Sequence, residues 1–319
     1  MNELDLAHLA ALSAAVAEGT FDAAARRLNV TPSAVSQRIK ALELSVGRVL
    51  VQRSKPVVAT ESGTALLRLA RQIDVLRGDV MRELGGGDIV GAEGVPGRAH
   101  RPVSVPIAVN ADSLATWMLP AVATLSAGFG GDGIAFDFHR EDESHTAELL
   151  RAGTVMAAVT ARAEPVQGCS SDFLGLMRYR PAASPEFARR WFANGGTPGE
   201  LALAPVVVFD SRDTLQHRYL RLRASEQDGG PSGDSAQVLD PPRHTVPASA
   251  DFVRAVALGL GWGMVPDLQR PGHDLVEIDP EGRVIDVPLH WQQWQLRTPS
   301  LDRVAAAVMA AAALALPQR

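Results

Sequence analysis

Cysteine is almost absent from this sequence, since Cys169 is the single cysteine in 319 residues. One thiol per chain excludes an intramolecular disulfide framework, a thiolate metal cage and a redox pair. Long apolar runs are missing too, because the Ala-rich segment 304–316 is too short to cross a bilayer and predicts a buried terminal helix instead. The first residues include acidic Glu3 and Asp5 where a secretory signal carries basic ones. We therefore expect a cytoplasmic protein with no membrane contact.

Signatures of catalysis and of metal binding are also scarce. No GxSxG stretch occurs, and Cys169 has no recognisable His and Asp partners. The segment HREDESH (139–145) holds two histidines six positions apart, which lie on different faces of a helix or about 20 Å apart along a strand. A charged loop explains it better than a metal site. The segment LGLGWG (258–263) lacks the full phosphate-binding pattern and predicts a tight helix-to-strand turn. We expect no enzyme activity, cofactor or metal.

Positive charge is concentrated in one short stretch of an acidic chain. The formal net charge is −5, yet the segment 20–60 holds seven basic residues against two acidic ones. A compact basic segment indicates nucleic-acid contact, although charge runs are more often only solvated surface. The seven are Arg26, Arg27, Arg38, Lys40, Arg48, Arg53 and Lys55.

Two short amphipathic patterns surround a three-residue interruption within this basic segment. A first helix, with apolar residues at helical spacing from Leu6, is predicted to end at Gly19. The second follows Thr20 and runs to Leu28. After the interruption, Thr31 is a capping residue and Pro32 occupies the first position of a third helix, where the missing N–H costs nothing.

The third helix has two distinct faces. Val35, Ile39 and Leu42 form an apolar stripe that continues to Val46. A second face is small and polar and suits a DNA major groove, where an amide such as Gln37 can bond adenine at two points. The alternative is a helical hairpin with a polar surface. The residues predicted to contact DNA here are Thr31, Pro32, Ser33, Ser36, Gln37, Arg38 and Lys40.

The next segment, VLVQRSKPVVAT, predicts a β-hairpin wing of two strands over 49–52 and 57–60. Arg53 and Lys55 at its tip are expected to contact phosphate or the minor groove, which positions a protein without reading sequence. The order of helices and wing in FDAAARRLNVTPSAVSQRIKALELSVGRVLVQR, followed by ATESGTALLRLA, resembles the LysR-type transcriptional regulators. The resemblance implies a winged helix-turn-helix domain over 1–60.

Residues 61–84 predict a linker and dimerisation helix. Apolar residues recur there at alternating steps of three and four, which is the spacing of a coiled-coil seam: Leu66, Leu69, Ile73, Leu76 and Val80. Such a helix can also pack on its own domain, but the regular seam favours a partner helix. A two-fold dimer would place two recognition helices in successive major grooves of an interrupted near-palindrome.

Beyond a glycine-rich hinge at 85–101, strand and helix patterns alternate, which predicts an α/β effector domain over 102–319. Strands are expected near 102–109, 134, 155, 206 and 263, with a turn and helix over 110–125. The LysR-type resemblance implies two subdomains like those of periplasmic solute-binding proteins, with the ligand in the cleft. Subdomain I would comprise 102–161 and 268–319, and subdomain II 162–267.

The segment NADSLATWMLPA resembles the family branch that responds to lysine and arginine and controls amino-acid export. RYRPAASPEF and FDSRDTLQ resemble it too. A helix start after a strand can bind a carboxylate, and acidic side chains at strand ends suit a cation, although Asp112 could equally be a helix cap and any one carboxylate a surface charge. The predicted effector residues are Asn110, Asp112, Ser113, Trp117, Glu141, Asp142, Thr160, Asp210 and Ser249.

These features together predict a regulator in which an amino acid changes how dimers, or tetramers as the resemblance implies, sit on promoter DNA and recruit RNA polymerase. Coupling of this kind is typically about 1–3 kcal/mol. Two rival classes remain open at this point: an architectural DNA-binding protein that senses nothing, and a solute receptor or enzyme built on the same cleft.

Overall fold

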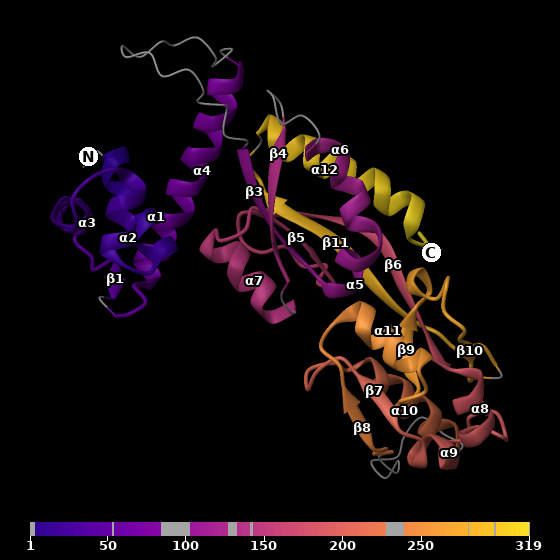
Figure 1. The fold of residues 1–319 in the computed structure, drawn as a ribbon. Helices are drawn as coiled ribbons and strands as arrows, with labels where there is room; N and C mark the ends of the chain where they lie inside the picture. The colour runs from indigo at the N-terminus through magenta and orange to yellow at the C-terminus, as the bar shows by residue number, and fades with distance from the viewer. Residues whose placement is uncertain are drawn as a thin grey trace.

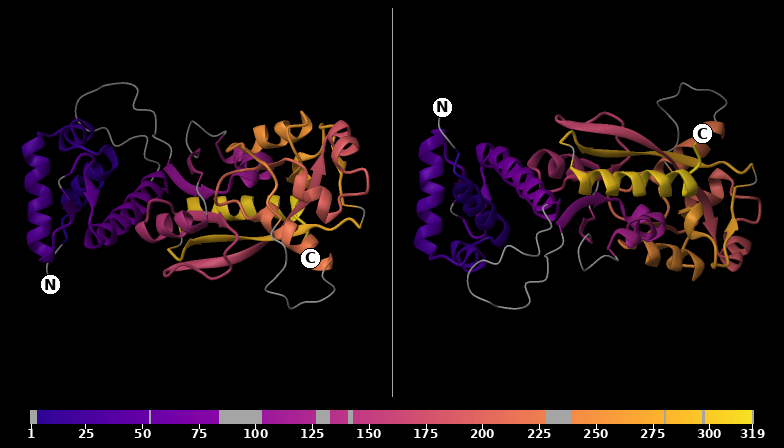
Figure 2. Two further views of the ribbon diagram at one scale, coloured as in Figure 1. Left: turned by 90° about the horizontal axis from the view of Figure 1, so that it is seen from below. Right: turned by 90° about the horizontal axis from the view of Figure 1, so that it is seen from above.

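The computed structural model describes residues 4–52, 54–83, 103–126, 133–140, 143–227, 239–279, 281–296 and 298–318. Figure 1 shows a small helical domain at the N-terminus, a long helix leading away from it, and a larger α/β domain of two lobes. The same separation is visible from below and from above in Figure 2. Three sequence predictions fall outside these residues: the hinge at 85–101, Arg53 at the wing tip, and the pair Glu141 and Asp142.

The N-terminal domain confirms the predicted helices. Each begins at a side chain that accepts a backbone N–H, namely Asp5, Thr20 and Thr31, and these caps satisfy amides that a helix start leaves unbonded. Asn29 takes the left-handed conformation between the second and third helices, which turns the chain sharply. The helices are α1 (Leu6–Glu18), α2 (Phe21–Leu28) and α3 (Pro32–Val46).

The wing is shorter than predicted. Its strands are β1 (Val51–Gln52) and β2 (Val58–Ala59), paired antiparallel, because only these residues complete the ladder. The linker helix α4 (Glu61–Glu83) then confirms the predicted long helix. Its buried residues Leu67 and Ala70 belong to the N-terminal core, whereas Val75, two turns further on, belongs to the core of the α/β domain.

The first lobe of the α/β domain contains three parallel strands. β3 (Val103–Val109) lies between β4 (Ile134–His139) and β5 (Ala157–Thr160). All of β5 and the last three residues of β3 are buried. After β3, one continuous helical segment runs through α5 (Ala111–Ser113), a π-helical turn (Leu114–Met118) and α6 (Leu119–Ser126). α7 (Glu143–Ala152) and α12 (Pro299–Ala315) complete this lobe.

Two long antiparallel strands connect the lobes. β6 (Cys169–Ala183) and β11 (Ile285–Trp294) pair from Cys169 with Trp294 to Tyr179 with Ile285. β11 also pairs with β5 in the first lobe, while the far end of β6 pairs with β9 (Gly263–Pro266) and β10 (Val276–Glu277) in the second. One mixed sheet of seven strands therefore runs through both lobes.

The second lobe is built around the end of this sheet (Figure 1). A separate parallel pair, β7 (Val206–Val208) and β8 (Arg243–Thr245), lies beside it. Its helices are α8 (Pro185–Trp191), α9 (Pro198–Leu203), α10 (Leu215–Gln227) and α11 (Ser249–Ala257).

The terminal helix α12 starts earlier than predicted, at Pro299 behind the cap Thr298. Leu301, Val304 and Val308 bury one face, but Leu314 is exposed, so the helix is amphipathic rather than buried all round. Its first turn is also bonded to the linker helix, because the Ser300 hydroxyl donates to Asp79 at 2.6 Å. Within the described ranges, no helix is long and apolar enough to cross a bilayer.

Candidate functional site

The exposed side of α3 carries the polar residues singled out in the sequence. Ser33, Gln37 and Lys40 are exposed, and Ser36 and Arg38 are partly exposed, whereas Val35, Ile39 and Leu42 are fully buried. The helix is therefore anchored by one stripe and presents the other to solvent. Thr31 is not free for a ligand in the same way, because its hydroxyl accepts from the Ala34 amide and contacts the Ser33 hydroxyl at 2.9 Å.

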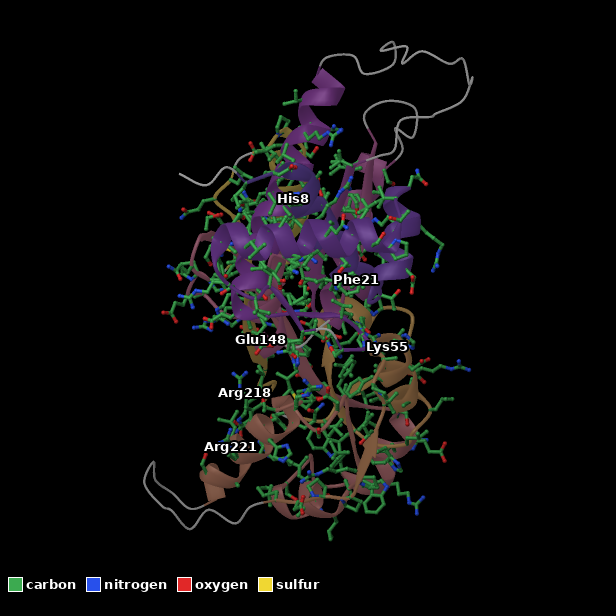
Figure 3. All side chains as sticks on the ribbon, turned by 90° about the vertical axis from the view of Figure 1, so that its left-hand side faces the viewer. His8, Phe21, Lys55, Glu148, Arg218 and Arg221 are labelled. Carbon is green, nitrogen blue, oxygen red and sulfur yellow. The ribbon has the colours of Figure 1, made fainter. Side chains whose placement is uncertain are left out.

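The basic residues of the wing and of α2 lie on the same domain. Lys55 is exposed, and Figure 3 shows it at the margin of the N-terminal domain. Arg26 is exposed at the end of α2, while Arg27 is paired with Glu18 at 3.1 Å. Such an arrangement, one exposed polar helix beside exposed cations, matches the needs of groove insertion and phosphate contact.

A cleft of about 380 Å³ lies where the two lobes meet, a size typical of small-molecule sites. Residues from both lobes and from the connecting strand β6 line it. Its walls are Asn110, Ala111, Asp112, Arg140, Tyr179, Phe209, Asp210, Arg212, Asp213, Leu215, Gln216, Pro247, Phe252, Met264 and Pro266.

Asp112 is the centre of a hydrogen-bond network that joins the lobes. Its carboxylate accepts from the Tyr179 hydroxyl at 2.6 Å, from the Ser249 hydroxyl at 2.6 Å and from the Gln269 amide at 3.4 Å. Asn110, not Asp112, caps the helix, since its side chain accepts from the Ser113 amide at 2.8 Å. Asp112 is therefore not the side chain that caps this helix, and it lines the cleft instead.

Tyr179 stays a hydrogen-bond donor to this carboxylate. Its ring is buried on β6, and burial, the negative charge of Asp112 and the hydrogen bond to it all raise the pKa of the phenol well above its usual range. The hydroxyl therefore keeps its proton at physiological pH and holds the Asp112 carboxylate in position through this hydrogen bond.

A second acidic group enters from the loop before α10. Burial raises the pKa of Asp213, and the negative charge of Asp112 adds to this effect. The backbone amides of Phe209 and Leu215, which donate to Asp213 at 3.0 Å each, and a side-chain hydrogen bond from Gln216 act in the opposite direction. Asp210 also lines the cleft, and one of its oxygens accepts from the Arg212 amide at 2.7 Å and the Asp213 amide at 3.0 Å.

The structure brings together four of the predicted effector residues and separates others from them. Asn110, Asp112 and Asp210 line the cleft, and Ser249 is bonded to Asp112. Three more lie elsewhere: Ser113 and Trp117 are buried in the helical segment behind the cleft wall, and Thr160 is buried at the end of β5, where its hydroxyl accepts from the Arg162 amide. Helical periodicity explains the Trp117 position, since it faces the core of the first lobe.

Sequence reasoning missed several cleft residues. Tyr179 lies in the RYRPAASPEF stretch and Arg140 in the HREDESH segment, but neither was predicted to reach the cleft. Their approach to the cleft depends on how β4 and β6 are placed in the sheet, which the sequence does not show. Asp213 and Gln216 lie in the FDSRDTLQ stretch that was singled out, but Asp210 was preferred there because it follows the strand directly.

Other reactive groups lie outside this cleft. Burial raises the pKa of the Cys169 thiol to about 11, so it stays protonated and unreactive at neutral pH. In the part of the chain that the structure describes, no three His, Cys, Asp or Glu side chains are grouped to hold a metal ion.

Comparison with known proteins agrees with both parts of the molecule. Residues 6–64 match the family model of bacterial regulatory helix-turn-helix proteins of the lysR family. The lysine export transcriptional regulatory protein LysG of Corynebacterium efficiens is 40% identical over 311 residues, covering 96% of this chain and 97% of that protein.

Two solved structures match the whole fold. ArgP from Mycobacterium tuberculosis is 39% identical, with a TM-score of 0.82 over 99% of this chain and 100% of that one. Full-length LysG from Corynebacterium glutamicum with bound effector Arg is 35% identical, with a TM-score of 0.73 over 98% of this chain and 100% of that one. The exposed helix of a winged domain, the cleft between two lobes and these full-length similarities lead to one conclusion: the chain belongs to the LysR family of transcriptional regulators.

Proposed function

We propose that this regulator senses a basic amino acid, lysine or arginine, in the cleft around Asp112 and controls a gene for amino-acid export. The observation that carries the proposal is that Asp112 of one lobe is bonded to residues of the other lobe and of the connecting strand. A ligand that engages Asp112 therefore acts on the relative position of the lobes. LysG of Corynebacterium glutamicum binds Arg, and the C. efficiens relative is named for lysine export.

The chemistry of the cleft suits a zwitterion with a further cation. The N-terminus of the helix at Ala111, together with Arg140, offers positive potential for a carboxylate. Asp112, Asp210 and Asp213 offer acceptors for ammonium or guanidinium groups. No role is assigned to Glu141 or Asp142, which lie outside the described residues.

The remaining assignments are part of the same proposal. Residues 1–60 bind promoter DNA, and Ser33, Ser36, Gln37 and Lys40 contact base edges and phosphates. Residues 61–84 form the dimer contact. Residues 102–319 bind the effector, with subdomain I over 102–161 and 268–319 and subdomain II over 162–267. The protein acts in the cytoplasm as a dimer or a pair of dimers, contacts RNA polymerase and catalyses no reaction. The effector changes promoter occupancy or DNA bending several-fold.

A thermal-shift screen with all twenty amino acids tests the effector role. A ligand at 100 times its dissociation constant adds about 2.7 kcal/mol to the free energy of unfolding, which is an easily measured shift. We expect arginine and lysine to raise the unfolding temperature while glutamate and leucine leave it unchanged. Equal curves for all twenty, together with identical promoter footprints, would contradict effector control.

Two substitutions separate sequence reading from general attraction to DNA. Gln37→Ala should cost about 1–3 kcal/mol on the preferred operator and nothing on random duplex, because it removes a base contact. Lys55→Ala should weaken both duplexes alike and reduce the salt slope by about one, because it removes a phosphate contact. Binding titrations at several salt concentrations measure both. A Gln37→Ala loss that is the same on both duplexes would favour an architectural protein.

A further inference from the structure

Two carboxylates enter the cleft from opposite lobes. Asp112 stands at the start of the helical segment of the first lobe, and Asp213 precedes α10 in the second. Both line the same cleft, and the negative charge of Asp112 is one of the causes that raise the pKa of Asp213. Like charges repel across a partly buried cleft, so the pair favours a positively charged group between them.

Both carboxylates keep acceptor capacity for a ligand. Tyr179 and Ser249 each donate to a different oxygen of Asp112. Phe209 and Leu215 likewise donate to different oxygens of Asp213. An ionised carboxylate has about four acceptor positions. Gln269 also donates to Asp112 and Gln216 to Asp213, so each carboxylate retains about one position for an incoming N–H.

A buried amide beside Asp213 offers a second acceptor for a ligand. Gln216 lines the cleft and is only 1% exposed, and its amide nitrogen is directed at Asp213, where this hydrogen bond lowers the pKa of the carboxyl. The side-chain oxygen of Gln216 has no hydrogen-bond partner within the described ranges. Figure 3 shows Arg218 and Arg221 pointing outward from α10, which places Gln216 on the opposite, inward face of the helix. Buried amide oxygens are nearly always bonded, so the Gln216 oxygen is an acceptor available to an N–H group of a ligand.

The two ends of an amino acid can be assigned from the positions of the positive groups. The helix start at Ala111 and Arg140 both belong to the first lobe, as Asp112 does. The second lobe contributes one cation to the cleft, Arg212, which already takes part in another interaction. The α-carboxylate therefore binds in that lobe, and the α-ammonium, which is covalently next to it, meets Asp112. The end of the ligand side chain then reaches across to the second lobe.

We propose, building on the effector role proposed above, that Asp213 and Gln216 form the subsite that recognises the cationic end of the ligand side chain. Asp213 supplies the charge, and the Gln216 oxygen accepts a further N–H. Because Asp112 and Asp213 lie on opposite lobes, the cation removes their repulsion and lets the lobes approach. A neutral amino acid of the same shape leaves that repulsion in place.

Calorimetric titration of the full-length protein with L-arginine and L-citrulline tests this subsite. Citrulline carries an uncharged group of nearly the same shape as guanidinium, so we expect it to bind about 30-fold or more weakly. Asp213→Asn should weaken arginine by a similar factor and change citrulline less than about threefold. The matched control is Asp274→Asn, which removes an exposed carboxylate outside the cleft and should change neither affinity.

The outcomes separate the subsite from the effector role. A wild-type protein that binds arginine and citrulline equally overturns the subsite but not the effector role. This outcome holds even if Asp213→Asn disturbs the loop before α10. An Asp213→Asn protein that keeps the full preference for arginine does the same. A wild-type protein that binds neither arginine nor lysine overturns the effector role and the subsite with it.

Discussion

Replacing both Leu76 and Val80 by glutamate is expected to make the protein monomeric and to weaken binding to its full operator by about 100-fold or more. These two seam residues are 38% and 48% exposed in the single chain. Apolar side chains at coiled-coil spacing are normally buried against a partner helix, so their exposure indicates a dimer contact. Two linked DNA-binding modules gain a factor of about 10²–10⁴ from effective concentration, and a monomer loses it. The two-fold arrangement on a near-palindrome would be lost as well.

The single chain offers a clean test because its own cores do not depend on these two side chains. Leu67, Ala70 and Val75 on other sides of α4 are the buried ones. Light scattering after size exclusion gives the mass, and operator titration gives the affinity. Gln72→Glu adds one negative charge, against two in the double variant, to α4 outside the seam and should leave both unchanged. A double variant that remains dimeric would place the dimer contact elsewhere.

The N-terminal domain could be predicted almost completely because its signals are local. Thr20 and Thr31 cap helices in the structure as their sequence positions indicate, and Asn29 adopts the left-handed turn. The buried stripe of α3 follows directly from a spacing of three and four residues. The wing strands are shorter than predicted because the ends of a strand depend on pairing with its neighbour, not on residue type.

In the α/β domain, the short strands and the helix after β3 could be predicted, but the long connecting strands could not. β6 extends over 15 residues, but its sequence CSSDFLGLMRYRPAA has no regular alternation of apolar and polar residues. The reason is that β6 is buried in one lobe, crosses to the other and meets different partners along its length. Its partner β11 lies more than a hundred residues away in sequence, so no local pattern announces the pair.

The cleft shows the same division between local and long-range information. Asp112 and Asp210 were found because acidic residues after strands carry a local signal. Tyr179 joins them only through the crossing strand, and Gln216 only through the inward face of α10. Trp117 belongs to the same motif as Asp112, but its side chain packs in the core. The two residues are about one and a half helical turns apart, so their side chains point to different sides of the helical segment.

Asp279→Asn is expected to lower the free energy of unfolding by about 3–5 kcal/mol, because it removes a buried negative charge that pairs with the buried Arg223 and the partly buried Arg283. The Asp279 side chain is fully buried and contacts two guanidinium groups, that of Arg283 at 2.9 Å and that of Arg223 at 3.6 Å. The Tyr219 hydroxyl also donates to it at 2.8 Å. Together these contacts join α10 to the segment after β10 within the second lobe. Tyr219→Phe removes one donor and keeps the charge, so it should cost only about 1.5–3 kcal/mol.

The pH dependence identifies the charge as the cause. Burial opposes ionisation of Asp279, but the bonds from Tyr219 and the Glu281 amide and the charges of Arg223 and Arg283 outweigh it, so its pKa is lowered. A carboxyl with a lowered folded pKa contributes stability above its unfolded value of about 3.9 and loses that contribution as the pH falls through the folded value. Urea denaturation should therefore show the full difference between wild type and Asp279→Asn at pH 7 and a shrinking one below pH 4. A difference under about 0.5 kcal/mol at pH 7, the level of an ordinary surface substitution, would show that this buried cluster does not hold the lobe together.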